Sequence, residues 1–119
     1  MINKETAEHN LWGNNCHGWH LVKQPELSVI QEMMPPKTSE VRHYHQRCLR
    51  RATPTHQFFF ILSRKATLEI DGSRQVLSQH EGVEVPPNVP HQMLNESDSD
   101  LEFLVISQPP THGDRVLVS

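Results

Sequence analysis

Short apolar segments alternate with turn residues along most of the chain. From Trp19 onward, runs rich in Val, Ile, Leu, Phe and Thr are separated by Gly, Pro, Asn and Asp, which is the pattern of an all-β sandwich or barrel. No segment has the length and periodicity of a long amphipathic helix. The pattern predicts strands at residues 19–22, 27–33, 40–45, 57–62, 66–70, 74–77, 83–85, 91–95 and 101–106.

Asp71-Gly72 is the clearest turn signal. It separates two predicted strands, and both residues tolerate the positive φ of a two-residue hairpin turn. Pro35-Pro36 and Pro109-Pro110 follow predicted strands, at positions where a missing N–H costs little. We therefore expect a tight hairpin at Asp71-Gly72 and strand ends at the two proline pairs.

The first 18 residues differ from the rest of the chain. They are polar and show neither helical nor strand periodicity, so we expect an N-terminal arm at 1–18 and one barrel domain at 19–119. Trp12 and Trp19 are large apolar side chains in this region, and we expect both to be packed against the barrel or a neighbouring copy.

Composition narrows the range of partners. The net charge of -3 argues against a nucleic-acid footprint, which needs a basic face. The N-terminal residues have no apolar core of a signal peptide, and no apolar run reaches membrane-spanning length, so we expect a cytoplasmic protein without a membrane partner. Cys16 and Cys48 lack the spacing of a disulfide framework or zinc ribbon, and we expect them to be structural or incidental. A small molecule and a second copy of the chain remain as partners.

Histidines provide the strongest functional signal. On a strand, His43 and His45 would point to the same face with Cα atoms about 7 Å apart, so both rings can reach one ion. His91 lies in a separate predicted strand and could complete the site. Imidazole suits Zn, Fe, Ni and Cu, and the availability of ions in the cell can also select Mn. The pattern predicts one divalent metal ion.

Two runs resemble the two motifs of the cupin family. The first is Arg42-His43-Tyr44-His45 with residues 57–63 and 66–72, and the second extends from Gly82 through His91 to Asn95. The resemblance covers roughly residues 19–118. It implies a double-stranded β-helix, the cupin jelly-roll barrel, which is usually dimeric and holds a divalent metal between the motifs.

The resemblance also implies roles for single residues. The metal ligands would be His43, His45 and His91, with Gln57 where many members have Glu; Asn95 would be structural. A stretch at 46–56, longer than the family pattern and expected to be an exposed loop, precedes Gln57. His56 could compete with Gln57, but adjacent strand residues face opposite ways and the following phenylalanines favour Gln57.

Three turn positions depart from the family pattern. Arg64, His80 and Asn88 stand where glycine is usual. If Arg64 or His80 has to adopt positive φ, each costs about 1–2 kcal/mol, whereas asparagine tolerates this geometry best among the other residues. The remaining histidines are expected to be structural or on the surface: His9, His17, His20, His80 and His112. Phe58, Phe59 and Phe60 are expected to form core and pocket wall.

The sequence points to a site more firmly than to a reaction. The best interpretation is a metal-binding small cupin with a pocket for a small organic ligand, and the candidate activities are dioxygenase, isomerase and decarboxylase. The alternative is a non-catalytic binding or sensing module with a structural or lost metal. Exposed strand edges and the arm predict a homodimer. Residues next to the ligands are expected to line the pocket: Tyr44, Met33, Phe60, Gln92 and Phe103.

Overall fold

The computed structural model describes residues 1–45, 55–110 and 115–118. These residues form strands and connecting turns, with no helix among them and hence none that could cross a membrane. The strands are β1 Glu8–Trp12, β2 Cys16–Lys23, β3 Ser28–Met34, β4 Thr38–Ser39, β5 His43–His45, β6 His56–Ser63, β7 Ala66–Ile70, β8 Ser73–Leu77, β9 Gly82–Val85, β10 His91–Asn95, β11 Leu101–Gln108 and β12 Arg115–Leu117.

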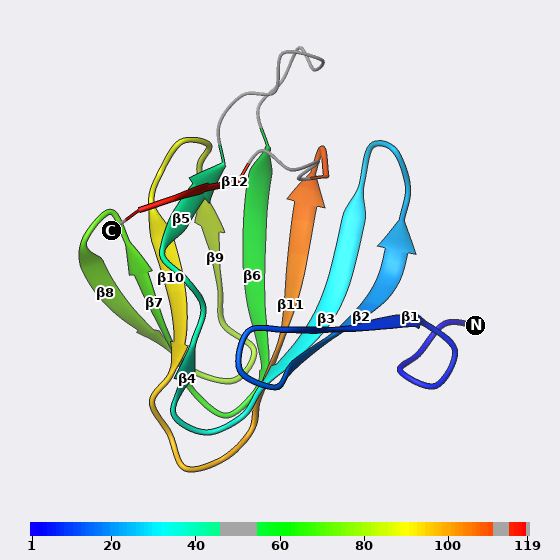
Figure 1. The fold of residues 1–119 in the computed structure, drawn as a ribbon, viewed down its shortest axis with the longest axis horizontal. Helices are drawn as coiled ribbons and strands as arrows, with labels where there is room; N and C mark the ends of the chain where they lie inside the picture. The colour runs from blue at the N-terminus through cyan, green and yellow to red at the C-terminus, as the bar shows by residue number, and fades with distance from the viewer. Residues whose placement is uncertain (46–54, 111–114, 119) are drawn as a thin grey trace.

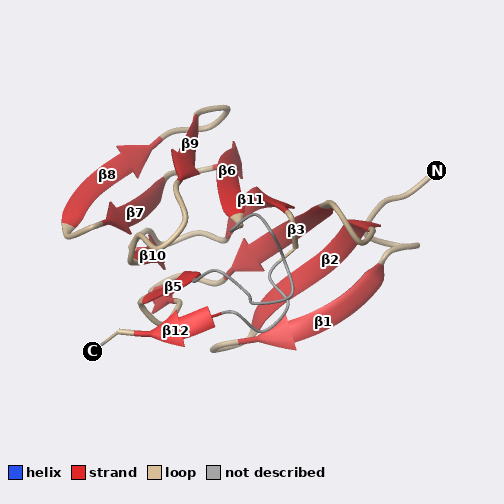
Figure 2. Cartoon of the chain, turned by 90° about the horizontal axis from the view of Figure 1, so that it is seen from above, coloured by secondary structure: helices blue, strands red, loops and turns tan. Residues whose placement is uncertain are grey.

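Two antiparallel sheets face each other (Figures 1 and 2). The first has the order β1-β2-β3-β11-β6-β9, and the second has the order β12-β5-β10-β7-β8 with β4 also paired to β10. Neighbours in a sheet are often distant in sequence, as in a rolled-up sheet. In Figure 1, β1 lies across the front of the molecule at the edge of the first sheet.

The strands confirm the all-β prediction. Every predicted segment contains a strand, and β7 and β10 have the predicted bounds. The predicted strand at 40–45 is shorter, because only His43–His45 is regular and residues 40–42 are not.

Residues 1–18 depart from the expected unpatterned arm. Residues 8–12 form β1, which pairs with β2 from Glu8↔His20 to Trp12↔Cys16. Four of the five β1 residues are exposed, so this edge strand lacks the apolar alternation that identifies a half-buried strand. The N-terminal segment is therefore a hairpin at the edge of the first sheet.

The predicted turns are confirmed. Asp71 and Gly72 have φ values of 51° and 82°, and Ile70 pairs with Ser73 across the two-residue loop. Arg64 and His80 adopt φ values of 70° and 66°, the left-handed region expected from their places in the family pattern. The fold holds these bulky residues in a conformation that costs about 1–2 kcal/mol each.

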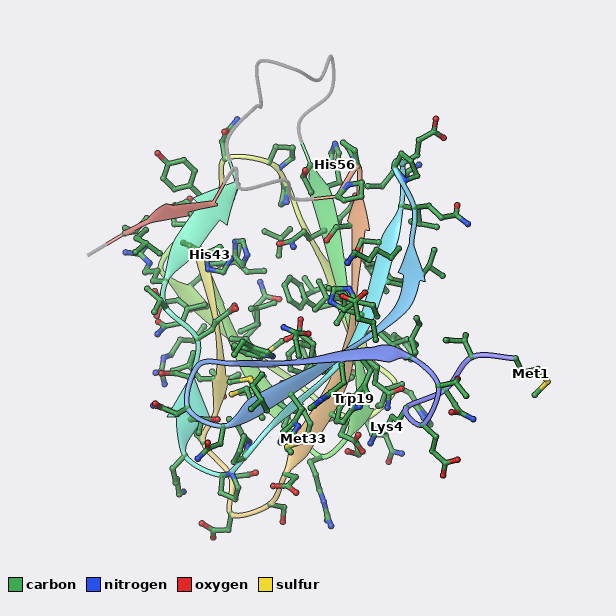
Figure 3. The ribbon with its side chains drawn as sticks, turned by 45° about the vertical axis from the view of Figure 1, so that its right-hand side comes forward. Met1, Lys4, Trp19, Met33, His43 and His56 are labelled. Atoms are coloured by element: carbon green, nitrogen blue, oxygen red, sulfur yellow. The ribbon has the colours of Figure 1, made fainter. Side chains whose placement is uncertain are left out.

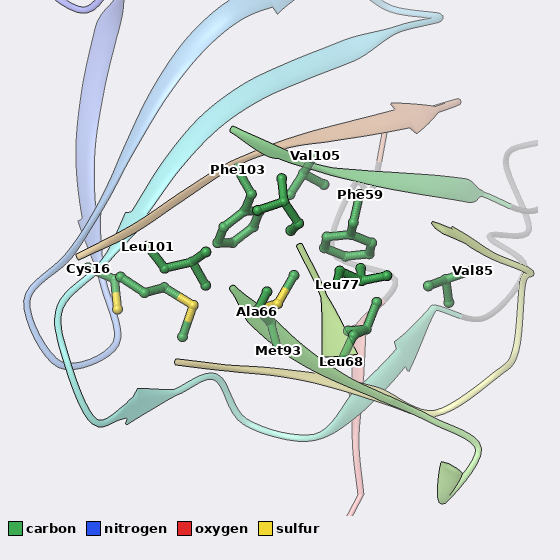
Figure 4. Close-up of a cluster of buried hydrophobic side chains, with 12 residues drawn as sticks. Cys16, Phe59, Ala66, Leu68, Leu77, Val85, Met93, Leu101, Phe103 and Val105 are labelled. Atoms are coloured by element: carbon green, nitrogen blue, oxygen red, sulfur yellow. The ribbon is translucent and has the colours of Figure 1, made fainter. Parts of the chain in front are cut away.

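An apolar core lies between the two sheets (Figure 4). Cys16 is buried in it, and this burial raises the pKa of the thiol, which suits the expected structural role. Cys48 lies outside the described residues. The core side chains come from both sheets: Cys16, Met34, Phe59, Ile61, Ala66, Leu68, Leu77, Val85, Met93, Leu101, Phe103 and Val105.

Asn95 closes the core at the end of β10. The side chain is fully buried, and its Nδ2 donates to the carbonyl oxygens of Met34, Pro35 and Ser99 at 2.8–3.1 Å. Its Oδ1 accepts from the backbone N–H and the hydroxyl of Ser97. This network satisfies the amide with protein groups, as expected for a structural residue.

Candidate metal centre and cavity

His43 and His91 lie directly opposite each other on β5 and β10. Both are buried, with 5% and 1% of their surface exposed, and their ring centroids are 4.4 Å apart. Figure 3 shows His43 between the two sheets. The structure therefore brings together one histidine from each motif.

Backbone carbonyls set the orientation of both rings. The Nδ1 atom of His43 lies 2.7 Å from the carbonyl oxygen of Val41, and the Nδ1 atom of His91 lies 3.0 Å from that of Val89. A carbonyl can only accept, so Nδ1 must carry the proton in each ring. Nε2 is then the nitrogen with the lone pair, which is the arrangement commonly found in metal-bound histidine.

Glu40 joins the two histidines. One ligand atom from each of Glu40, His43 and His91 can be chosen so that all three lie within 4.8 Å of one another. Two atoms bonded to one ion at about 2.1 Å can be at most about 4.2 Å apart, so a small side-chain adjustment brings all three into range. Two imidazoles and one carboxylate therefore fit a divalent ion.

Glu40 was missing from the ligands expected from sequence. It lies three residues before His43, and a regular strand would place the two on opposite faces. Residues 40–42 are irregular, however, and Glu40 is fixed on β10: its Oε1 accepts from the backbone N–H of Met93 at 2.9 Å, and its carbonyl oxygen accepts from Gln92 at 2.9 Å. The only sequence signal was a carboxylate close to a His-x-His pair.

Gln57, rather than His56, points inward. Gln57 is 7% exposed and lines the same cavity as His43, while His56 is exposed and faces Glu84 at 3.8 Å. The Nε2 atom of Gln57 donates to the hydroxyl of Ser107 at 3.1 Å. Its Oε1 has no hydrogen-bond partner among the described residues.

Some expected features fall outside the described residues. His45 belongs to β5 and its backbone pairs with Arg115, but its side chain is not described. The predicted loop is described only at Thr55 and His56, and His112 is not described. The role of His45 as a ligand therefore stays a prediction.

A cavity of about 400 Å³ opens beside the candidate metal centre. Its wall combines both sheets with the N-terminal hairpin: Asn10, Trp12, Gly18, His20, Ser28, Ile30, Glu32, Glu40, His43, Gln57, Phe59, Phe103, Val105 and Ser107. This volume falls in the range of small-molecule sites, about 300–1,000 Å³.

Of the five residues expected to line a pocket, only Phe103 lines this cavity. Met33, Tyr44, Phe60 and Gln92 do not, because each is next to an inward-facing residue on its strand and alternation turns it away. Phe60, for example, stacks on His80 with centroids 6.1 Å apart, while Phe59 faces the cavity.

Two residues of the hairpin line the cavity. Trp12 packs against the apolar core, as expected, and also lines the cavity. His20, expected to be structural or on the surface, lines it as well. His9 and His17 meet the expectation, since they stack beside Trp19 on the other face of the hairpin. Side chains alternate along β2, so Gly18 and His20 face the cavity while His17 and Trp19 face away from it. This alternation follows from the strand beginning at Cys16.

Comparison with known proteins identifies the fold. A family model for the cupin domain matches residues 30–107. No protein of curated function matches the chain. The double-stranded β-helix expected from the motifs is therefore confirmed by a family match over most of the chain and by the solved structures below.

Several solved cupins superpose on the chain with low sequence identity. An RmlC-like cupin from Shewanella frigidimarina has a TM-score of 0.80 at 17% identity. The match covers 95% of this chain and 93% of the Shewanella chain. A predicted oxalate decarboxylase from Thermotoga maritima has a TM-score of 0.79 at 15% identity, and the match covers 92% of this chain and 99% of the Thermotoga chain. A sugar phosphate isomerase from Silicibacter pomeroyi has a TM-score of 0.76 at 17% identity, and the match covers 92% of this chain and 76% of the Silicibacter chain. At these identities the likeness shows the fold alone.

Proposed function

Because this chain belongs to the cupin family, we propose that it holds one divalent metal ion at Glu40, His43 and His91 and positions a small organic ligand beside it. The observation that carries the proposal is the pair of Nδ1 contacts to the carbonyls of Val41 and Val89. These contacts make Nε2 the ligand nitrogen of both rings, and Glu40 adds a carboxylate to the same cluster. His45 is a further ligand by its place in the motif.

Glu40 changes the expected chemistry of the ion. Three histidines and Gln57 would leave a divalent ion without charge compensation, whereas Glu40 supplies one negative charge. With His45 the shell would hold three histidines and one carboxylate. Its part at Glu40, His43 and His91 is the donor set of many non-haem iron(II) sites, and zinc and manganese also accept these ligands. We therefore favour iron, zinc or manganese over copper and nickel.

The cavity wall supports catalysis in preference to passive binding. A bound divalent ion would polarise a carbonyl or hydroxyl oxygen of the ligand. His20 and Glu32 line the same cavity, so titratable groups are available to move a proton at a neighbouring carbon. Gln57 cannot take a proton, but its amide can orient the ligand. Of the candidate activities, isomerisation by proton transfer uses these residues best.

Metal analysis of untagged protein purified without chelator tests the metal centre. We expect about one ion per chain, falling sharply in His43→Ala, His91→Ala and Glu40→Gln. The glutamine retains an oxygen that can accept from the N–H of Met93, so it removes mainly the charge. His56→Ala and Glu84→Gln are matched controls on an exposed pair and should keep the metal.

Two results would separate the alternatives. Full metal content in all three site variants would contradict the assignment of the centre. A ligand that binds beside the metal but is recovered unchanged after long incubation would favour a sensing module over an enzyme.

We also propose that the protein is a homodimer, a proposal supported by the outer face of the first sheet. Phe58 and Phe60 pair there with Ile106 and Leu104 on β11, and Phe58 remains 37% exposed. Such a row of apolar side chains is typical of an interaction surface. Light scattering should report a dimer that Phe58→Glu dissociates, while Val76→Glu on the second sheet leaves it intact.

A further inference from the structure

The cavity beside the candidate metal centre is covered by the N-terminal hairpin. Asn10 and Gly18 face each other across β1 and β2, and both line the cavity with Trp12 and His20. A Cβ atom at Gly18 would lie 2.8 Å from Oδ1 of Asn10, so the glycine allows this side chain to lie over β2. The cover is therefore closely packed, and it lies before the residues matched by the family model.

Three buried polar atoms belong to side chains that line this cavity and lack a hydrogen-bond partner among the described residues. They are Nε1 of Trp12, Nδ1 of His20 and Oε1 of Gln57. The indole can only donate, the amide oxygen can only accept, and the imidazole nitrogen can do either. Buried polar groups normally find partners, so a ligand that both donates and accepts would complete this site.

The charge of the described wall disfavours an anionic ligand. Among the described residues that line the cavity, Glu32 and Glu40 are acidic and none is Lys or Arg. The two carboxylates balance the charge of a divalent ion and leave no positive charge for a carboxylate or phosphate group. Phosphate recognition normally relies on arginine, lysine or a helix N-terminus, and the described wall contains none of these.

The apolar part of the wall limits the rest of the ligand. The ring of Trp12 and the side chains of Ile30, Phe59 and Val105 provide surface for C–H groups, and Ser28 and Ser107 add two hydroxyls. Hydroxyl groups on a small carbon skeleton match this mixture, because each hydroxyl donates and accepts. The volume of about 400 Å³ suits a single monosaccharide-sized molecule.

We propose that the cavity takes an uncharged, unphosphorylated monosaccharide or similar polyol, held by Trp12 and His20 of the hairpin and by Gln57 of β6. This assignment rests on the proposed function, which takes the cavity as the ligand site and places a divalent ion beside it. The Trp12 N–H donates to one ligand oxygen, and a second ligand hydroxyl donates to Oε1 of Gln57. His20 contacts a third oxygen.

Tryptophan fluorescence provides a direct test. The chain has two tryptophans, and Trp19 is on the other face of the hairpin beside Lys4 (Figure 3), so a Trp19→Phe background leaves Trp12 as the reporter. The probes are glucose, mannose and fructose, each beside its phosphate ester, with glucuronate as a carboxylate probe. Metal content is measured in the same samples.

We expect at least one neutral sugar to change the Trp12 emission and raise the melting temperature, and its charged counterpart to bind at least about ten-fold more weakly. Charged probes that bind as well as neutral sugars would overturn the inference. Failure of every neutral sugar with metal-loaded protein would also overturn it, while leaving the metal centre in place. Loss of metal from the wild-type protein would instead count against the proposed function.

Variants test the individual contacts. Calorimetric titration with the binding sugar should show about ten-fold weaker binding for Trp12→Phe, which removes the N–H but keeps an aromatic ring, and for Gln57→Leu. Trp19→Phe is the matched control and should bind as the wild type does. Unchanged affinity in both Trp12→Phe and Gln57→Leu, with their folds verified by circular dichroism, would overturn the proposed contacts.

Discussion

The two ends of the space between the sheets differ although the same strands build both. Along the inward face of β11, Leu101 and Phe103 lead to Ser107, and along β6, Ile61 leads to Gln57. On β10, Met93 is fully buried in the core, whereas His91 is opposite His43. One end is a packed apolar core and the other is a polar cavity.

This difference indicates a division of labour within one fold. The apolar end supplies burial, which is the main favourable contribution to folding. The polar end retains buried groups without protein partners, such as Oε1 of Gln57, and these lower stability until a ligand binds. Substitutions at the apolar end should therefore lower stability much more than substitutions at the polar end.

The largest effect is expected at the apolar end. Leu68 is fully buried on β7, so Leu68→Ala should lower the free energy of unfolding by about 2–5 kcal/mol through lost burial and the cavity left behind. Urea denaturation of the metal-free protein measures this change. Val76→Ala on the paired strand β8 is the control, since Val76 is 64% exposed and should change stability little. Similar losses for both would contradict the placement of the core.

A much smaller effect is expected at the polar end. Gln57→Leu keeps the approximate volume, removes an unpartnered oxygen and gives up one hydrogen bond to Ser107. The free energy of unfolding of metal-free protein should therefore stay within about 1 kcal/mol of the wild-type value, or rise. A loss as large as that of Leu68→Ala in the same denaturation experiment would show that the polar end also carries the fold.

A small effect is also expected at the turn between β6 and β7. Arg64 has a φ of 70°, so Arg64→Gly should relieve strain that outweighs the entropy cost of glycine and raise the free energy of unfolding by about 0.5–1 kcal/mol. Lys65→Gly at the next position, which has no positive φ, should lower it by a similar amount. Equal effects of the two substitutions would exclude backbone strain as the cause.

Much of the fold was predictable because its signals are local. The Asp71-Gly72 turn and the strands around it follow from residue types over a few positions, and His43 and His91 follow from their motifs. Glu40 could not be predicted, because its inward position depends on the irregular chain at 40–42. The cavity side of β2 could not be predicted either, because β1 carries no apolar pattern that would identify the hairpin.

The hairpin of β1 and β2 lies outside the part of the chain that the family model matches. It contributes Trp12 and His20 to the cavity, yet it precedes the matched residues 30–107, while His43 and His91 lie within them. Changes in a terminal hairpin can therefore redirect ligand preference without disturbing the metal centre or the core. Variation confined to this hairpin would change which ligand the protein binds and would leave the barrel and its candidate metal ligands the same.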